Sequence, residues 1–329
     1  MILLISLRFL GISIERLPDG RTKIHQRRYV EDMVQRFLPD GTATSKVPHI
    51  TSVKLTKLMS PQTEEAKAEM SNVPYRSLIG ALLHLANHTR PDIAAQVNIC
   101  AQYSANPGEQ HWRAALQILK YLKATPGYGV IYGPPKTDKV PYVPLVGYSD
   151  ASWADDQDDR TSRSGIMVWS WGGPIEWRST KQKSQALSST EAEYYAACET
   201  AKSIIWSRRL YEEFGYTDLG IAETDNGIAA PMTEAEQSGA KPTIIFEDNS
   251  GCIDWSRNPV QHQRSKHIDI RYHYVRAKVK SGEIKLVYCN TDDQLADLLT
   301  KYLAAPDTPR FAYLRDMMVG DGVCDVHGG

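Results

Sequence analysis

The second half of the chain predicts an α/β fold, and the region before it predicts a separate group of helices. After Gly127, strand-like and helix-like runs follow in the order three strands, helix, strand, helix, strand, helix, which is typical of a mixed sheet with helices packed on it. Over residues 74–125, in contrast, apolar residues recur at spacings of three and four. This spacing predicts a separate helical region with a packed core.

Residues 1–50 predict a strand hairpin followed by a helix. Residues 18–20, Pro-Asp-Gly, separate two alternating apolar runs, and these residue types favour a tight turn. An amphipathic run at 29–38 predicts the helix, and the polar residues 51–73 predict a linker.

Residues 141–305 predict the α/β domain itself, with five strands in a mixed sheet. The expected strands are 143–149, 165–172, 174–180, 243–248 and 284–289, and the expected helices are 189–214, 249–257, 268–282 and 293–303. Ser189 or Thr190 is expected to cap the long helix. Residues 217–241 carry few bulky apolar groups and are expected to form a surface insertion, and 306–329 a flexible tail.

Charge is distributed unevenly along a chain whose net charge is only −1. Residues 160–183 hold five basic residues against one acid, and 256–285 hold eight against two. Basic patches beside acidic positions suit a nuclease, which must attract phosphate to a site that repels it. The alternative is a pair of ordinary solvated surfaces.

Cysteine usage and hydropathy exclude several protein classes. The five cysteines are scattered and show no CxxC spacing, which predicts a reducing, intracellular setting without a disulfide framework or zinc site. No apolar stretch reaches the roughly 18 residues of a membrane span, so we expect no membrane contact. Arg8 interrupts the apolar N-terminus, which therefore predicts a strand rather than a signal peptide.

Four acidic residues are candidates for a metal site. Asp150 and Asp248 each follow an apolar strand-like run, so both lie at one edge of the sheet if these strands are neighbours. Glu193 lies in the first turn of the long predicted helix and Asp297 in the last one. An all-oxygen set of this kind suits hard divalent cations rather than zinc, and paired cations cut phosphodiester bonds.

Three segments carry a resemblance to a known family. They are GYSDASWADDQDDRTSRSGIMVWSWGGPIEWRSTKQKSQALSSTEAEYYAACE, EDNSGCIDWSRNPVQHQRSKHIDIRYHYVR and DQLADLLTKYL. In order and spacing they resemble the ribonuclease H segment of copia-type LTR retrotransposon Pol polyproteins. Upstream, residues 8–37 resemble the end of the reverse transcriptase domain, and residues 75–132 resemble the stretch that joins it to ribonuclease H.

The resemblance implies a domain organisation. Residues 1–50 are expected to be a C-terminal remnant of the reverse transcriptase, 74–140 a helical region similar to a polymerase thumb or connection, and 141–305 a ribonuclease H-like domain. The family's polymerase signature precedes the FLGI segment, so we expect no polymerase active site in this chain. Asp155-Asp156 then matches that signature only by coincidence.

The resemblance also implies endonucleolytic hydrolysis of the RNA strand of RNA–DNA hybrids with two Mg²⁺ ions, for which Mn²⁺ can substitute. The family's catalytic, metal-binding carboxylates carry over onto Asp150, Glu193, Asp248 and Asp297. Glu193 is preferred to Glu191, because an Ala-Glu pair followed by two apolar residues matches the family's helix start.

Five further residues are expected to bind nucleic acid. Arg163, Lys181 and Lys183 are expected to contact phosphates, which position a duplex without reading its sequence. Ser189 offers a hydroxyl to the backbone, and Asn249 is expected to contact the 2′-hydroxyl that distinguishes RNA from DNA.

Two other groups of residues lead to further hypotheses. Many ribonucleases H carry a histidine just before the last acid, but VYCNTDDQLAD has none, and Asp292 or Asp293 is the stand-in. His262, His267 and His273 lie in a strongly basic segment, where a substrate-facing role is favoured over zinc binding.

The expected partners are an RNA–DNA hybrid and the remainder of the polyprotein in a full-length element. The expected location is intracellular, in cytoplasmic virus-like particles or the nucleus. The alternative hypothesis is a non-catalytic nucleic-acid-binding remnant of a degenerate retrotransposon.

Overall fold

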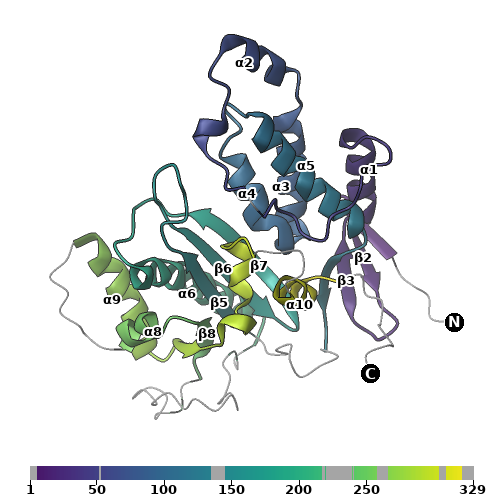
Figure 1. The fold of residues 1–329 in the computed structure, drawn as a ribbon. Helices are drawn as coiled ribbons and strands as arrows, with labels where there is room; N and C mark the ends of the chain where they lie inside the picture. The colour runs from purple at the N-terminus through teal and green to yellow at the C-terminus, as the bar shows by residue number, and fades with distance from the viewer. Residues whose placement is uncertain are drawn as a thin grey trace. The chain divides into compact units, whose positions relative to one another are not determined.

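The computed structural model describes residues 6–51, 53–134, 145–216, 219, 239, 241–257, 266–303 and 309–320. Figure 1 shows the ribbon. The chain divides into two compact units. Unit 1 comprises residues 1–133, 157–159 and 301–329, and unit 2 comprises residues 134–156 and 160–300.

Unit 1 contains a small antiparallel sheet in the order β1-β2-β3-β4. Its strands are β1 Ser6–Phe9, β2 Ile12–Arg16, β3 Thr22–His25 and β4 Gly129–Tyr132. The predicted turn at 18–20 is confirmed, since Gly20 has a φ of 86° and its amide donates to the Leu17 carbonyl at 2.9 Å. Strand β4 falls inside the region for which the sequence predicts only helices.

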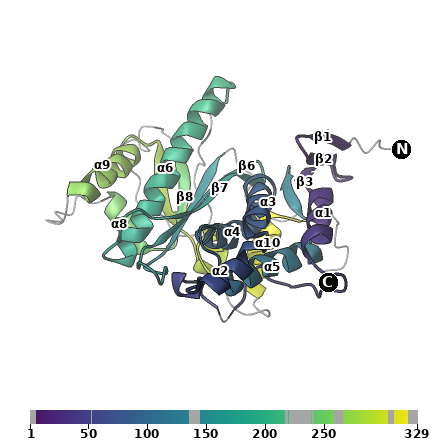
Figure 2. The ribbon, with the colours of Figure 1, turned by 90° about the horizontal axis from the view of Figure 1, so that it is seen from above.

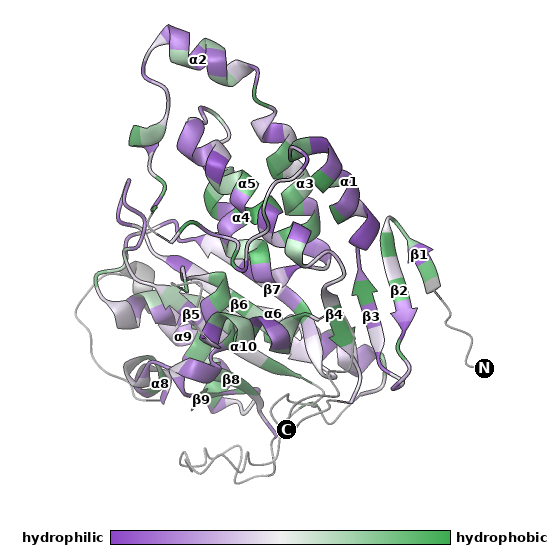
Figure 3. Cartoon of the chain, turned by 45° about the vertical axis from the view of Figure 1, so that its right-hand side comes forward, coloured by the Kyte–Doolittle hydropathy of each residue, from purple (hydrophilic) through white to green (hydrophobic). Residues whose placement is uncertain are grey.

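The helices of unit 1 enclose a separate apolar core. They are α1 Arg27–Phe37, η1 Lys57–Met59, α2 Glu64–Ser71, α3 Tyr75–His88, η2 Pro91–Ile93, α4 Ala94–Ala101, α5 Glu109–Ala124 and α10 Pro309–Met318. Leu78, Leu82 and Leu85 of α3 are fully buried at the i, i+4, i+7 spacing that the pattern predicts. Figure 3 shows the hydrophobic part of α3 in green.

Two expectations for unit 1 differ from the structure. The expected linker contains η1 and α2, and α2 begins where the Thr63 hydroxyl accepts a hydrogen bond from the Ala66 amide at 3.2 Å. Part of the expected flexible tail forms α10, and Gly320 after it pairs with Gly129 of β4. Phe311 and Leu314 of α10 are buried, which explains why this segment is ordered.

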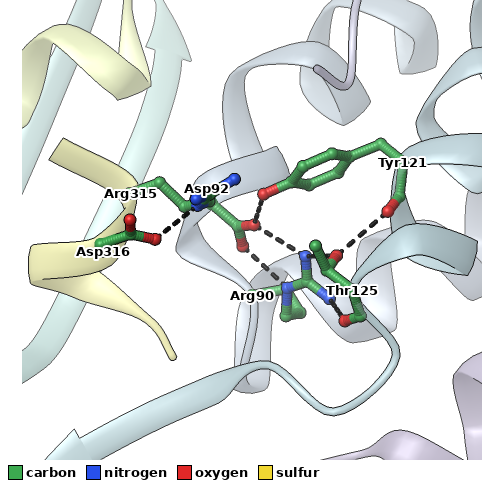
Figure 4. A network of polar contacts seen from close by, with 6 residues as sticks. All are labelled: Arg90, Asp92, Tyr121, Thr125, Arg315 and Asp316. Carbon is green, nitrogen blue, oxygen red and sulfur yellow. Dashed lines mark hydrogen bonds and ion pairs between the residues drawn. The ribbon is translucent and has the colours of Figure 1, made fainter. Parts of the chain in front are cut away.

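A buried ion pair joins α5 to the segment between α3 and α4 (Figure 4). Arg90 and Asp92 are 1% and 0% exposed, and the Arg90 guanidinium donates to both Asp92 carboxylate oxygens, at 2.9 and 2.8 Å. Arg90 also donates to the Thr125 carbonyl and hydroxyl, and the Tyr121 hydroxyl donates to Asp92 at 2.6 Å. The charges and hydrogen-bonding groups of this pair are therefore matched within unit 1.

Unit 2 is built on a five-stranded sheet in the order β7-β6-β5-β8-β9. The strands are β5 Val146–Ser152, β6 Arg163–Ser170, β7 Gly173–Lys181, β8 Thr243–Glu247 and β9 Ile284–Tyr288. Strands β5, β6 and β7 pair antiparallel, whereas β8 is parallel to both β5 and β9. The predicted α/β fold with a mixed five-stranded sheet is thus confirmed.

Helix α6, Ser189–Glu213, packs across β5 and β6, and Figure 2 shows it together with α8, Ser250–Arg257, and α9, Lys266–Lys280. Close packing needs Gly147 of β5, since a Cβ there would lie 2.9 Å from the Thr200 methyl group. The expected cap of α6 was wrong. Ser188 caps the helix, and its hydroxyl accepts from the Glu191 amide at 3.1 Å.

The last predicted helix, 293–303, is also wrong. The segment forms two short 3-10 turns, η3 Thr291–Asp293 and η4 Leu295–Leu299. The buried Gln294 between them donates to the carbonyls of Ser149 and Phe246, at 3.0 and 3.4 Å. These bonds tie the turns to the ends of β5 and β8, and a continuous helix would break them.

Several expectations fall outside the described residues. The expected insertion at 217–241 is described only at residues 219, 239 and 241. His262 lies outside the description, and the side chain of His267 is likewise not described. Within the described part of the chain, no helix is both long and apolar enough to cross a membrane.

Candidate active site

Three carboxylates converge at one edge of the five-stranded sheet. Asp150 of β5, Glu193 of α6 and Asp248 directly after β8 each offer a carboxylate oxygen, and these oxygens all lie within 4.8 Å of one another. Asp150 and Glu193 are 0% and 6% exposed, whereas Asp248 is half-buried. We call these three residues the carboxylate cluster.

Parallel pairing of β5 with β8 brings Asp150 and Asp248 together. Gly147 pairs with Ile245 and Tyr148 with Phe246, so both chains reach the same edge of the sheet a few residues later. Asp150 lies inside β5 rather than at its end, because the strand continues to Ser152. The prediction that the two aspartates are neighbours is therefore confirmed, although the predicted strand ends at residue 149, three residues before the observed end at Ser152.

Hydroxyl groups fix the two aspartates. The Thr300 hydroxyl, directly after η4, donates to the Asp150 carboxylate, and the Thr291 hydroxyl of η3 donates to Asp248 at 2.9 Å. Turn η4 reaches Asp150 because Gly165 lies opposite it on β6, where a Cβ would lie 2.6 Å from the Ala296 carbonyl oxygen. Sequence reasoning missed both threonines and the glycine.

The structure places Glu193, not Glu191, in the carboxylate cluster. The two residues are two apart on α6 and do not share a face. The Glu191 carboxylate instead accepts hydrogen bonds from the Leu187 amide and the Tyr195 hydroxyl, at 2.8 and 2.7 Å.

Asp297, the fourth predicted ligand, is not a member of the carboxylate cluster. It lies in η4, a turn that packs against β5 and β6, and is fully buried. Its carbonyl accepts from the hydroxyl of Thr300, the residue that also binds Asp150. Asp297 is thus coupled to the cluster through Thr300.

A further buried carboxyl group, which sequence reasoning missed, adjoins the cluster. Glu247 at the end of β8 is 0% exposed and accepts hydrogen bonds from the Ser149 hydroxyl at 2.8 Å and the Asn249 amide at 3.2 Å. Burial raises the pKa of Glu247 well above its usual range, and the charges of Asp150 and Asp248 raise it further, although both hydrogen bonds oppose this. The sequence signal for this group is the position of Glu247, directly before Asp248 at the end of an apolar run.

The residues of the cluster fit a divalent cation. Their donor atoms are all carboxylate oxygens, which hard cations prefer. Like charges this close repel strongly unless a cation lies between them. No other group of three or more metal-ligating side chains lies together among the described residues.

Comparison with known proteins decides the family. No protein-family model matches the sequence. The chain is 37% identical over 295 residues to the retrovirus-related Pol polyprotein from transposon TNT 1-94 of Nicotiana tabacum, which covers 89% of this chain and 20% of that protein. It is 38% identical over 309 residues to the corresponding polyprotein from transposon RE1 of Arabidopsis thaliana, which covers 92% of this chain and 18% of that protein. The chain belongs to the family of copia-type retrotransposon Pol polyproteins.

The chain spans about a fifth of the length of the curated relatives that it matches. Among solved structures, it is similar to LC11-RNase H1 in complex with an RNA/DNA hybrid, with a TM-score of 0.29 and 9% identity. That match covers 46% of this chain and 88% of the solved chain. The strand order of unit 2 and the family together agree with the predicted ribonuclease H-like fold class.

The residues expected to bind nucleic acid differ in accessibility. Lys183 and Ser189 are exposed. Lys181 is half-buried and forms an ion pair with Asp156 at 2.6 Å. Asp156 therefore has a structural role in this chain.

Two of the residues expected to bind nucleic acid, Arg163 and Asn249, form hydrogen bonds within the protein. Arg163 is only 8% exposed, and its guanidinium donates to the Ser179 hydroxyl of β7 at 3.3 Å. Burial makes it a poor candidate for contact with phosphate. The Asn249 side-chain oxygen accepts from the Cys252 amide at 3.0 Å and so caps α8, which leaves its amide group for other partners.

Proposed function

We propose that the chain hydrolyses the RNA strand of RNA–DNA hybrids as an endonuclease, within the cell and as a segment of a longer polyprotein. The observation that carries this proposal is the carboxylate cluster, whose oxygens lie within 4.8 Å of one another at the edge of the sheet. Membership of the Pol family and the solved ribonuclease H1 with its hybrid support the choice of substrate.

Asp150, Glu193 and Asp248 would hold two Mg²⁺ ions, for which Mn²⁺ can substitute, and Asp297 would join them as an outer member. Divalent cations bound there supply an activated water and stabilise the leaving oxygen. The protein's own groups orient the carboxylates: Thr300 fixes Asp150, and the carbonyl of Asp297 in turn accepts from Thr300.

Substrate selection is assigned to groups around the cluster. The exposed Lys183 attracts phosphate, and the half-buried Asn249 offers its side-chain amide to the 2′-hydroxyl of RNA. The half-buried Lys181 contributes positive charge but is partly neutralised by Asp156.

The test is cleavage of an end-labelled RNA–DNA hybrid by the full chain with Mg²⁺. We expect metal-dependent internal cuts in the RNA strand only, and Asp150→Asn should reduce the rate by more than about 100-fold, since outer-shell changes alone cost 10–100-fold. Asp32→Asn, on α1 of unit 1, is the matched control and should cut like the parent. Equal and metal-independent rates in all three proteins would contradict the proposal.

A further inference from the structure

Two large apolar side chains are exposed near the carboxylate cluster. Trp153 follows Asp150 by three residues, about 10 Å along an extended chain, and is 51% exposed. Leu187, directly before the cap of α6, is 73% exposed. The Trp153 indole donates to the Ala186 carbonyl at 3.0 Å, so the two side chains belong to one surface. We call Trp153 and Leu187 the apolar ridge.

Glu191 fixes the backbone of this ridge. Glu191 is 5% exposed, and its carboxylate accepts hydrogen bonds from the Leu187 amide and the Tyr195 hydroxyl. A capping box alone would explain a bond from Glu191 to the amide of the cap residue, Ser188. Here the glutamate reaches one residue further, to Leu187, and so holds the chain outside the helix.

Tyr195 connects this arrangement to α9. The Arg271 guanidinium lies over the Tyr195 ring, 4.2 Å from its centroid. The Tyr195 hydroxyl donates to the Glu191 carboxylate at 2.7 Å. The contacts from Arg271 through Tyr195 to Glu191 therefore fix the backbone amide of Leu187.

The surroundings of the ridge favour a nucleic-acid occupant. Along the chain the ridge flanks the carboxylate cluster, since Trp153 lies three residues after Asp150 and Leu187 six residues before Glu193. The exposed Lys183 lies four residues before Leu187. An aromatic face accepts a sugar or base without regard to sequence, while the neighbouring cation attracts the backbone. A nucleotide presents both an apolar face and a phosphate, so it matches this combination.

We infer that the apolar ridge contacts sugar and base faces of the RNA–DNA hybrid beside the scissile phosphate, and that Glu191 is its positioning residue. This inference rests on the proposed function. It assigns substrate affinity to Trp153 and Leu187, and the chemical step to the carboxylate cluster.

The ridge is tested by Trp153→Ala, Trp153→Phe and Leu187→Ser in the full chain. Both positions are exposed, so the substitutions remove contact surface without opening the core. We expect Trp153→Ala and Leu187→Ser to raise Kd and KM for a short fluorescein-labelled RNA–DNA hybrid about tenfold, with kcat nearly unchanged, and Trp153→Phe to retain most of the affinity. Circular dichroism confirms that each variant is folded.

Matched controls are available on the same unit. Trp206 of α6 is 62% exposed and lies thirteen residues after Glu193, about 20 Å along the helix axis. Ile270 of α9 is 74% exposed. Trp206→Ala and Ile270→Ser remove equally exposed apolar surface and should leave Kd and KM at the parent values.

Glu191 is tested by a readout that a role in helix capping alone would not change. In protein labelled with 5-fluorotryptophan, the ¹⁹F resonance of Trp153 is assigned as the one that Trp153→Phe removes. This resonance should shift in Glu191→Ala. In Glu191→Gln it should lie close to its position in the parent, because the side-chain amide oxygen of the glutamine still accepts a hydrogen bond from the Leu187 amide. KM should follow the same order. An unmoved resonance with parent KM in Glu191→Ala would overturn the positioning role.

The outcomes separate the ridge from the proposed function. If the parent chain cuts hybrid and the ridge variants have the same Kd and KM as the parent, the inferred role of the ridge is contradicted and the proposed function is not. A parent that binds hybrid without cutting contradicts the function alone, and the Kd values of the variants still decide the ridge. A parent that neither binds nor cuts overturns both.

Discussion

Each unit of the molecule holds a group of buried charged residues, and the two groups differ in how their charge is compensated. In unit 1, Arg90 meets Asp92 through two hydrogen bonds, and Tyr121 and Thr125 bind the remaining groups. In unit 2, Asp150 and Glu193 are buried together with the half-buried Asp248, a set of three like charges.

The difference distinguishes a structural group from a functional one. A buried ion pair whose charges and hydrogen bonds are all matched has no remaining capacity for a ligand. Clustered carboxylates within 4.8 Å instead lower their free energy when a cation binds between them. We therefore expect the two groups to respond oppositely to substitution and to metal.

The largest expected effect on stability is in unit 1. Arg90→Met leaves Asp92 buried without its cation, and breaking such a pair destabilises a protein by about 3–5 kcal/mol. Chemical unfolding with peptide-level hydrogen exchange should show this loss in unit 1. Arg90→Met combined with Asp92→Leu should recover much of the stability, because no buried charge is left. If the double variant is as unstable as Arg90→Met alone, the loss of stability does not come from the uncompensated charge of Asp92.

Metal should stabilise unit 2 alone. A ligand that binds only the folded state at about 100 times its Kd adds about 2.7 kcal/mol to the free energy of unfolding. Hydrogen exchange of β5, β8 and α6 should therefore slow in saturating Mg²⁺, while α3 and α5 exchange as before. Asp150→Asn should abolish the effect. Equal slowing in both units would mean that the cation acts non-specifically.

A smaller effect is expected at Gly165, which lets η4 approach Asp150. In Gly165→Ala the new methyl group meets the Ala296 carbonyl at 2.6 Å, and backbone must move to accept it. Overpacking of this kind costs about 1–3 kcal/mol, and displacement of Thr300 should weaken metal binding as well. Gly80→Ala on α3, where a Cβ meets no atom within 4 Å, is the control. Unchanged metal affinity in Gly165→Ala would show that the position of η4 does not affect metal binding by the carboxylate cluster.

The smallest expected effect is a pH dependence confined to unit 1. Burial lowers the pKa of His49 from 6.5, and neither ring nitrogen has a hydrogen-bond partner among the described residues. Below pH 6.5 the unfolded state binds a proton that the folded state does not, so the contribution of His49 is present above this pH and is lost as the pH falls. Urea unfolding from pH 7.5 to 5.5 should show a shallower decline for His49→Leu than for the parent. If the free energy of unfolding declines equally with pH in both proteins, His49 is not the cause of the decline.

Much of unit 2 could be predicted from local pattern. Strand and helix periodicity predicts the five strands. The positions of Asp150 and Asp248 directly after two apolar runs predict their convergence, since parallel neighbours reach the same edge of a sheet. The cap of α6 was also within reach, because Ser188 lies three residues before Glu191, which is the spacing of a capping box.

The rest of the site depends on contacts between distant residues. Thr300 lies 150 residues from Asp150, and nothing local marks it as a partner. The apolar periodicity of 293–303 resembles a helix, but the bonds of Gln294 to β5 and β8 override it. Arg163 lies in a basic run, which predicts contact with phosphate, whereas its strand is buried throughout.

The central claim is that the carboxylate cluster of unit 2, and not the ion pair of unit 1, takes divalent cations. Mn²⁺ titration of the full chain, with the free ion followed by electron paramagnetic resonance, tests it most directly. We predict saturable binding that Asp150→Asn weakens by more than about 100-fold and that Asp92→Asn leaves unchanged in a folded protein. Binding that survives Asp150→Asn, or none in the parent, would contradict the account.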